Sequence, residues 1–321
     1  MPSVQTRLLL AAALLVFAGA CGPAPKKSSD TFQAPAAPAN GVQLHIPPFQ
    51  VAAHSEREMC RFMKAPANAD GTIVKIHMVA RKNIHHAFVM AVGSDIPDGE
   101  VPCFGIPDEA MQGVDIPEPL FASSTEVPDE KVDFPSGVGI ALKAGEQLIF
   151  DYHYVNPTAQ PITGEIYLNL DFAPAGAQLQ PAKVYVFGNM GGIDIPAHGT
   201  ESLTTTCTFP NDTHVVSVTP HMHQLGVGFK IMRYDGTQPT DTLYQTDTWD
   251  DPKTEIFDPV LDMKAGEGLT FTCDWDNTTD KAVGFGQTSK DEMCFVFGYY
   301  YPADQKLLRL DITGGCTQNS P

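Results

Sequence analysis

The feature that most constrains the fold of this chain is the spacing of its apolar residues. In nearly every patterned segment they recur at alternate positions, the period of a β-strand with one buried face. Such sets are Leu148, Phe150, Tyr152 and Tyr154; Ile166, Leu168, Leu170 and Phe172; and Phe295, Phe297, Tyr299 and Tyr301. Turn sequences such as Pro97-Asp98-Gly99 separate them, and no long amphipathic helix pattern is present. We therefore predict an all-β chain made of two tandem antiparallel β-sandwiches with jelly-roll-like folds.

An internal repeat supports two related halves. The segment from Lys143 to Phe150, followed by Asn156, matches the segment from Lys264 to Phe271, followed by Asn277. The offset is 121 residues at both ends, from 143 to 264 and from 156 to 277. Two similar hairpin turns would explain the shared Ala-Gly-Glu, but the equal spacing of the distal asparagines favours a repeated structural unit.

The length of the chain also favours two domains. About 280 residues follow the N-terminal region, more than one compact core usually holds. The strand pattern is interrupted at residues 174–181, whose sequence is PAGAQLQP. We predict an N-terminal domain over residues 41–176 and a C-terminal domain over residues 177–321.

The first 21 residues have the pattern of a secretion signal. Arg7 precedes an apolar run from Leu8 to Ala18 that is too short to span a bilayer. Small residues then precede Cys21, which resembles a bacterial lipobox; ordinary signal cleavage with an unmodified Cys21 is the alternative. Residues 22–40 are rich in Pro, Ala, Ser and Lys, which predicts a disordered linker. We expect an exported protein of the bacterial cell envelope, in the periplasm or on the cell surface, which contacts the membrane only through a lipid on Cys21.

Charge and cysteine content narrow the classes of function. The formal net charge is −18 and no basic patch offsets it, which argues against nucleic-acid binding. Apart from Cys21, six of the seven cysteines remain, and in an exported chain an even number predicts three disulfides. Composition alone leaves 15 connectivities open.

A histidine pair in Thr219-Pro220-His221-Met222-His223 is the first candidate metal site. Side chains at alternate positions of a strand point to one side, so both imidazoles can bind one ion. Such a pair also occurs on ordinary half-polar sheet faces. Met293 lies on a face with Phe295, where a methionine is usually packing, but with His221 and His223 it would complete a His₂Met set.

A second candidate set lies in the N-terminal half. His85 and His86 are adjacent at the start of an apolar strand, where neighbouring side chains normally face opposite sides. Both can bind one ion only if the backbone twists or bulges; otherwise one faces the core and the other faces solvent. His153 lies on the polar face of its strand, where it is either an ordinary surface residue or the third member of a trio. Thioether favours Cu(I), so a His₃ set and a His₂Met set together predict two redox-active coppers.

Four motifs carry a family resemblance, in order and at similar spacing: "HHAFVMAVG", "DYHYVNP", "TPHMHQLG" and "GQTSKDEMCFVFGYYYP". From about Glu56 to Cys316 the chain resembles the copper type II, ascorbate-dependent monooxygenases, the family of peptidylglycine α-hydroxylating monooxygenase and dopamine β-monooxygenase. The resemblance implies two copper ions per chain. The electron-transfer copper would be held by His85, His86 and His153. The catalytic copper, where oxygen binds and the substrate is hydroxylated, would be held by His221, His223 and Met293.

The resemblance also implies a disulfide pairing, namely Cys60–Cys103, Cys207–Cys316 and Cys273–Cys294. The chain departs from the peptide-hydroxylating member at the positions that hold a peptide carboxylate. Thr219 replaces an arginine, and Phe295 and Phe297 replace an asparagine and a tyrosine. A glycine-extended peptide is therefore a poor candidate substrate, and a less polar small molecule is favoured.

The functional prediction that follows is a monooxygenase that inserts one atom of O₂ into a C–H bond. An external reductant such as ascorbate would supply the two electrons. The alternative is a lipid-anchored copper-binding or electron-transfer protein without oxygenase activity. A purely structural or carbohydrate-binding β-sandwich would leave the six ligand-type residues as coincidence.

Overall fold

The computed structural model describes residues 32–103, 118–305, 307–309 and 316–319. The predicted signal peptide (1–21) and residues 22–31 of the predicted linker lie outside this part. Residues 1–33 and 34–321 form two separate units, and every strand of the described residues belongs to the second unit. Among the described residues no helix has the length and apolarity needed to cross a membrane.

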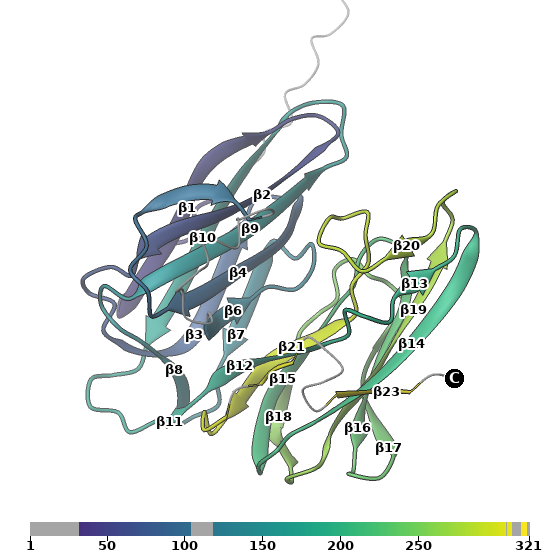
Figure 1. Ribbon diagram of the computed structural model, residues 1–321. Helices are drawn as coiled ribbons and strands as arrows, with labels where there is room; N and C mark the ends of the chain where they lie inside the picture. Colours follow the sequence, from purple (N-terminus) through teal and green to yellow (C-terminus); the bar gives the residue numbers. More distant parts are fainter. Residues whose placement is uncertain (1–31, 104–117, 306, 310–315, 320–321) are drawn as a thin grey trace, which may run out of the picture. The chain divides into compact units, whose positions relative to one another are not determined.

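The first pair of sheets is built from the strands β1 to β11 (Figure 1). One sheet has the order β1-β10-β3-β8-β11, with β7 also paired to β3. Its strands are β1 (Gly41–Val51), β3 (Gly71–Ala80), β7 (Asp129–Asp133), β8 (Val138–Leu142), β10 (Ile162–Phe172) and β11 (Gln180–Pro181). The other has the order β5-β2-β9-β4-β6. Its strands are β2 (Ser55–Lys64), β4 (Ile84–Val92), β5 (Gly99–Pro102), β6 (Glu118–Ala122) and β9 (Gln147–Asn156).

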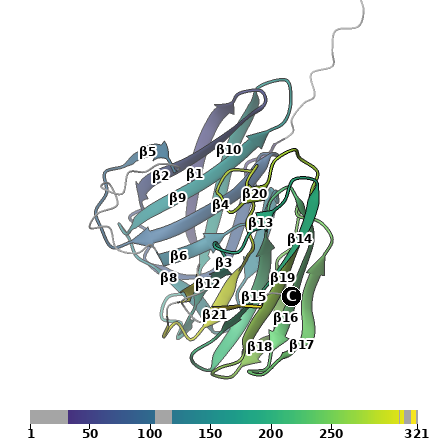
Figure 2. The same cartoon turned by 45° about the vertical axis from the view of Figure 1, so that its right-hand side comes forward.

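The second pair of sheets is built from strands β12 to β23 (Figure 2). One sheet has the order β18-β15-β21-β12-β22, formed by β12 (Lys183–Gly188), β15 (Thr213–His221), β18 (Glu255–Met263), β21 (Phe295–Tyr301) and β22 (Leu308–Arg309). The other has the order β17-β16-β19-β14-β23, formed by β14 (Gly199–Thr208), β16 (Gly226–Tyr234), β17 (Pro239–Thr246), β19 (Gly268–Asn277) and β23 (Cys316–Asn319). A short two-stranded sheet joins β13 (Asp194–Ile195) to β20 (Val283–Gly284).

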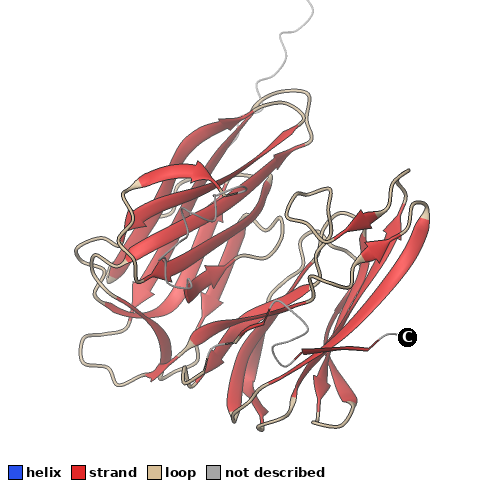
Figure 3. Ribbon diagram, in the orientation of Figure 1, coloured by secondary structure: helices blue, strands red, loops and turns tan. Residues whose placement is uncertain are grey.

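Alternating burial along the strands confirms the all-β prediction, and strands and loops make up the described chain (Figure 3). In β9 the side chains of Leu148, Phe150, Tyr152 and Tyr154 are fully buried. They pack in one core with apolar residues of β1, β3 and β10 from the facing sheet. A second core joins β12, β15 and β21 to β14, β16 and β19 in the same way. Each pair of sheets is therefore a sandwich. The sheets change between β11 and β12, while the domain limits given above remain predictions.

The sequence repeat is a repeated structural unit. The side-chain amide of Asn156 donates to the carbonyl of Gln160 at 2.9 Å, and its oxygen accepts from the backbone N–H of Thr158 at 3.0 Å. Asn277 makes the same two contacts, 121 residues later, with Lys281 at 2.8 Å and Thr279 at 2.9 Å. Each asparagine ends a long central strand, β9 or β19, and closes the following turn.

The end of the predicted linker that the structure describes is attached to the first sandwich. The carbonyl of Pro35 accepts a hydrogen bond from Gln43 at 3.2 Å. The carbonyl of Ala36 accepts one from Asn169 at 2.9 Å. These bonds hold the chain against β1 and β10 before β1 begins.

Candidate metal centre

The two adjacent histidines of β4 face the same side because the strand is irregular at that point. β4 pairs with β9 in a register that matches Ile84 with Tyr154 but His86 with His153. Two residues of β4 thus span one step of β9, so His85 is the extra residue of a β-bulge. A bulge redirects a side chain that a regular strand would turn to the other face. The irregularity that a shared site requires is therefore present.

The bulge brings the predicted trio together. One potential ligand atom from each of His85, His86 and His153 lies within 4.8 Å of the other two. The three residues are buried, with exposed fractions of 1%, 6% and 0%. His153 lies on the face of β9 opposite the sandwich core, as the sequence pattern predicts.

Two carboxyl groups lie next to Nε2 atoms of this trio. His153 Nε2 is 2.9 Å from Glu56 Oε2, and His86 Nε2 is 3.6 Å from Glu58 Oε1. The ionised carboxylate of Glu56 only accepts hydrogen bonds, so it favours the proton of His153 on Nε2 and its lone pair on Nδ1. Histidine ligands of metals are commonly oriented by such a carboxylate partner. The sequence analysis did not identify either glutamate.

The second histidine pair follows the end of β15. His221 is the last residue of the strand, and His223 lies in the turn before β16. His223 Nδ1 is 3.0 Å from the carbonyl oxygen of Asp291, which can only accept. The proton of His223 is therefore on Nδ1, and its lone pair is on the buried Nε2.

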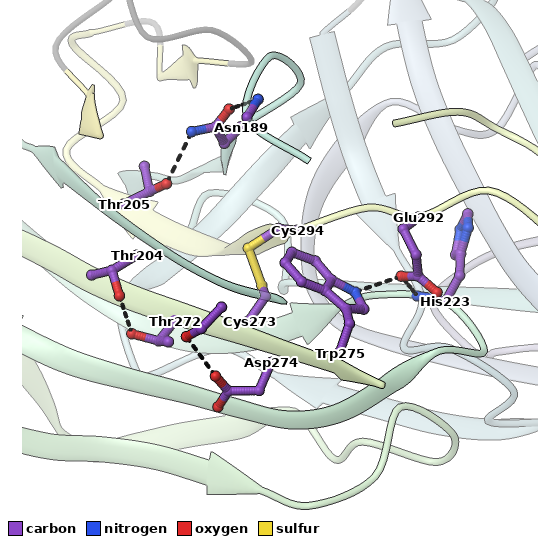
Figure 4. Close-up of a disulfide and its surroundings, with 12 residues drawn as sticks. Asn189, Thr204, Thr205, His223, Thr272, Cys273, Asp274, Trp275, Glu292 and Cys294 are labelled. Carbon is purple, nitrogen blue, oxygen red and sulfur yellow. Dashed lines mark hydrogen bonds between the residues drawn. A yellow bond between two sulfur atoms is a disulfide. The ribbon is translucent and has the colours of Figure 1, made fainter. Parts of the chain in front are cut away.

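Glu292 fixes the turn that carries His223 (Figure 4). Its carboxylate accepts hydrogen bonds from the backbone N–H of His223 at 3.0 Å, the backbone N–H of Leu225 at 2.8 Å and Trp275 Nε1 at 2.8 Å. Glu292 is fully buried, and burial raises its pKa to about 7, although hydrogen bonds from these three donors and from the backbone of Met293 oppose that rise. The residue before Met293 thus positions the residues around His223, a role that the sequence analysis missed.

His221 is held by a residue of the first sandwich. Thr125, which follows β6 and is fully buried, places its hydroxyl 2.8 Å from His221 Nδ1. The carbonyl of Thr125 accepts a hydrogen bond from the backbone N–H of Asp251 at 3.1 Å. Nothing in the sequence around Thr125 signals this contact, because the two residues are 96 positions apart.

A buried polar network lies beside Thr125. The carboxylate of Glu130 accepts from the backbone N–H of Ser124 at 2.7 Å and from the hydroxyls of Ser124 and Thr254 at 2.8 Å. The hydroxyl of Thr254 also lies 2.8 Å from that of Thr219. Burial raises the pKa of Glu130. Thr219, which stands where the family resemblance implies an arginine, is thus hydrogen-bonded inside the protein to the hydroxyl of Thr254.

Met293 lines a cavity next to the histidines. The cavity has a volume of about 180 Å³, and its lining includes His86, His221 and Met293. Its apolar wall is formed by Phe88, Val186, Phe295 and Phe297. The expectation that Met293 shares a face with the two C-terminal phenylalanines therefore agrees with the structure.

The five histidines form one cluster rather than two distant groups. The ring of His85 is centred 5.3 Å from that of His86, 4.9 Å from His153, 6.1 Å from His221 and 5.1 Å from His223. The rings of His221 and His223 are 5.1 Å apart. From the sequence we expected two trios, and their contact through His85 was not foreseen.

Four histidines of the cluster, His86, His153, His221 and His223, favour the neutral form. Burial, together with the neighbouring His153, lowers the pKa of His86 well below its usual value. Burial and His223 do the same for His221, and burial lowers the pKa of His223 to about 3. Burial also lowers the pKa of His153, while Glu56 opposes the change. Neutral imidazole is the form that binds metal ions.

Carboxyl groups beside the cluster titrate in opposite directions. The hydrogen bond from His153 lowers the pKa of Glu56 to about 2, so this carboxylate is ionised. Burial, with the charges of Asp151 and Glu56, raises the pKa of Glu58. Glu56 therefore contributes a negative charge beside the cluster, whereas Glu58 favours its neutral form.

The cluster has the properties of a metal site. Among the described residues, buried ring nitrogens of His85 (Nδ1 and Nε2), His86 (Nδ1) and His223 (Nε2) have no hydrogen-bond partner. An unsatisfied buried polar atom costs about 1–3 kcal/mol, so several in one place indicate that a bound cation completes the structure. Imidazole and thioether donors together suit copper better than calcium or magnesium.

Comparison with known proteins agrees with this donor set. Residues 181–313 match the family described as "Copper type II ascorbate-dependent monooxygenase, C-terminal domain". This match supports the copper type II ascorbate-dependent monooxygenase family for residues 181–313. The match contains His221, His223 and Met293, and the resemblance drawn from the sequence is confirmed for this monooxygenase domain. The family is one of copper-dependent oxidoreductases that use ascorbate.

Two solved structures show weak likeness to the chain. They are the major capsid protein P2 from bacteriophage PM2 (14% identity, 81% of this chain and 97% of that chain, TM-score 0.33) and the PBSX exported protein XepA (9% identity, 84% and 90%, TM-score 0.21). Likenesses at such low TM-scores indicate neither the fold nor the function of this chain. No curated protein matches it.

The disulfides of the monooxygenase domain and of the first sandwich are those implied by the resemblance. Cys60 pairs with Cys103, Cys207 with Cys316 and Cys273 with Cys294. The last pair connects β19 to the residue after Met293 (Figure 4). It therefore fixes the end of the segment that carries the candidate sulfur ligand.

Proposed function

We propose that the chain is a copper-dependent monooxygenase that hydroxylates a C–H bond of a small organic substrate. One oxygen atom of O₂ enters the C–H bond, and the other leaves as water with two electrons from an external reductant, such as ascorbate, and two protons. The observation that carries the proposal is the cluster of five buried histidines beside Met293 and a cavity with one apolar wall.

The proposal assigns two copper ions to the cluster. His85, His86 and His153 would hold one ion, and His221, His223 and Met293 would hold the other. Bound copper supplies one-electron redox chemistry and the activation of O₂. The buried ring nitrogens described above support the assignment because a cation would satisfy them.

The residues of the chain orient the ligands and select the substrate. Glu56 and Asp291 favour the ring protons of His153 and His223 on the outer nitrogens. Phe88, Phe295 and Phe297 form one wall of the cavity, whose volume of about 180 Å³ fits only a small substrate or part of one. An apolar or aromatic molecule suits this lining better than a peptide with a free carboxylate.

We also propose that the protein is exported and anchored to the bacterial cell envelope by a lipid on Cys21. The three disulfides support an oxidising compartment, because such bonds persist mainly outside the cytosol. Metabolic labelling with a fatty-acid analogue tests the anchor. A Cys21→Ser variant should lose the label, and equal labelling of both proteins would contradict this part of the proposal.

The enzymatic proposal is tested by oxygen uptake of copper-loaded protein with ascorbate and a panel of small aromatic and aliphatic amines, alcohols and acids. At least one substrate should consume O₂ and yield a product that contains ¹⁸O from ¹⁸O₂. The variant Met293→Ile keeps an apolar side chain of similar volume but removes the sulfur, and it should abolish turnover while the His₃ site still binds copper. Unchanged turnover in this variant would refute the ligand assignment. Copper binding without substrate-dependent oxygen uptake across the panel would favour a copper-binding or electron-transfer protein.

A further inference from the structure

Glu56 lies between the two ligand sets. It is on β2, next to β9, and its Oε2 atom is 2.9 Å from Nε2 of His153. The same Oε2 atom also accepts a hydrogen bond from the backbone N–H of Ser289 at 3.3 Å. One oxygen atom thus contacts a histidine of the His₃ set and the segment that leads to Met293.

Three hydrogen bonds close a turn around Ser289. Asp291 Oδ2 accepts from the backbone N–H of Thr288 at 3.1 Å and from its hydroxyl at 2.7 Å. The backbone N–H of Asp291 donates to the carbonyl of Thr288 at 3.0 Å, which closes the turn. Ser289 lies inside this turn, so its contact with Glu56 also holds the turn.

The turn ends at the second ligand set. The carbonyl of Asp291 accepts the Nδ1 proton of His223 at 3.0 Å. Glu292 then binds the backbone of His223, and Met293 follows directly. His153 is therefore connected to His223 by the hydrogen bonds of Glu56, the backbone from Ser289 to Asp291, and the hydrogen bond between Asp291 and His223.

We propose that Glu56 is a positioning residue that couples the two copper sites, so that each site binds copper more tightly when Glu56 bridges them. The coupling rests on the ligand assignment of the proposed function. Glu56 holds the proton of His153 on Nε2 and directs Nδ1 toward the metal. Through Ser289 it holds the turn that places His223 and Met293. Energetic coupling through such a path is reciprocal, so a change at either end is felt at the other.

The first test measures the imidazole tautomer without copper. In ¹⁵N-labelled apoprotein, the ring nitrogen shifts of His153 should report a proton on Nε2. In Glu56→Ala the preference should be lost, and in Glu56→Gln it should be partly kept because the amide oxygen can still accept. A His153 tautomer that is the same in the wild type and in Glu56→Ala would overturn the positioning role.

The second test measures copper affinity at both sites by competition with a Cu(I) chelator. The binding step that disappears in Met293→Ile identifies the second site. Removal of an outer carboxylate partner typically weakens metal binding about 10–100-fold, so Glu56→Ala should weaken the His₃ site by that factor. The second site should weaken at least about fivefold, the lower end of typical coupling, although Glu56 contacts none of its ligand side chains.

Two controls separate coupling from general damage. Ser289→Ala keeps the backbone donor and should leave the His₃ site within about twofold of the wild type and the second site weakened less than in Glu56→Ala. Glu255→Ala, an exposed position on β18, should change neither site. If Glu56→Ala weakens the His₃ site alone and leaves the second site within twofold, the coupling is refuted. Because neither assay requires turnover, failure of the monooxygenase proposal and failure of the coupling remain distinguishable.

Discussion

Replacing Glu292 with alanine should destabilise the second sandwich and disturb the second candidate copper site together. The carboxylate is fully buried and accepts from three N–H groups, two on the backbone at His223 and Leu225 and one on Trp275. Alanine leaves all three donors without their acceptor. The two backbone donors belong to the turn between β15 and β16, so that turn should loosen.

The magnitude follows from the three bonds. A hydrogen bond to a charged group contributes about 1.5–3 kcal/mol to stability when it is measured alone. The three bonds share one acceptor, so their losses do not add fully, and we expect Glu292→Ala to cost about 4 kcal/mol. For a folded domain of roughly 150–250 residues, a loss of about 4 kcal/mol in the free energy of unfolding corresponds to a fall of roughly 8–16 °C in Tm. Glu292→Gln should cost about 2 kcal/mol, because its amide oxygen replaces part of the acceptor but its NH₂ group faces a donor.

Differential scanning calorimetry of the apoprotein at pH 8 measures this effect, because Glu292 is then above its pKa of about 7. X-ray absorption of the Cu(I)-loaded protein should also show a weaker copper–sulfur contribution in Glu292→Ala. The exposed Glu255→Ala serves as the control and should stay within about 0.5 kcal/mol of the wild type. A loss below 1 kcal/mol in Glu292→Ala would show that the three contacts do not support the turn.

Three further substitutions test other parts of the structure. Thr125→Val removes the hydroxyl beside His221 and should weaken Cu(I) binding at the second site about 10–100-fold in a chelator competition; an unchanged affinity would show that the contact does not orient the ring. Burial raises the pKa of Glu130, so the folded state binds its proton more tightly than the unfolded state, and the free energy of unfolding should fall as the pH rises above 4.5. Urea titrations at several pH values should show a smaller fall in Glu130→Gln than in the wild type. An equal fall in both proteins would contradict the argument. Replacing Cys273 and Cys294 with serine opens a loop of 21 residues and should cost about 3 kcal/mol, measured by urea unfolding against the oxidised wild type, with equal midpoints as the contrary result.

The strand pattern could be read from the sequence because apolar residues recur so regularly at alternate positions. In β9 every second residue from Leu148 to Tyr154 is buried in the core, as the spacing predicts. The repeat was also readable, because Asn156 and Asn277 close equivalent turns. The pairing of the sheets was not, since sheet order depends on contacts between segments far apart in the chain.

The candidate site was predictable at its ligand-type residues and not around them. Histidine and methionine carry their chemistry in the residue type, and the family motifs mark them. Glu56, Thr125 and Glu292 contact histidines of the cluster that are 97, 96 and 69 positions away in the sequence. Glu292 follows a polar run, residues 287–291, so nothing in the local sequence marks it as a buried carboxylate.

The bulge at His85 makes the His₃ set depend on the length of the chain as well as on its composition. Deleting one residue at this point would restore a regular ladder between β4 and β9 and turn one imidazole to the far face, with little loss of hydrogen bonding. Conversely, one inserted residue would create such a set in a regular sandwich whose neighbouring strands already carry histidines. Insertions and deletions therefore deserve the same attention as point substitutions when this site is engineered or sought in other chains.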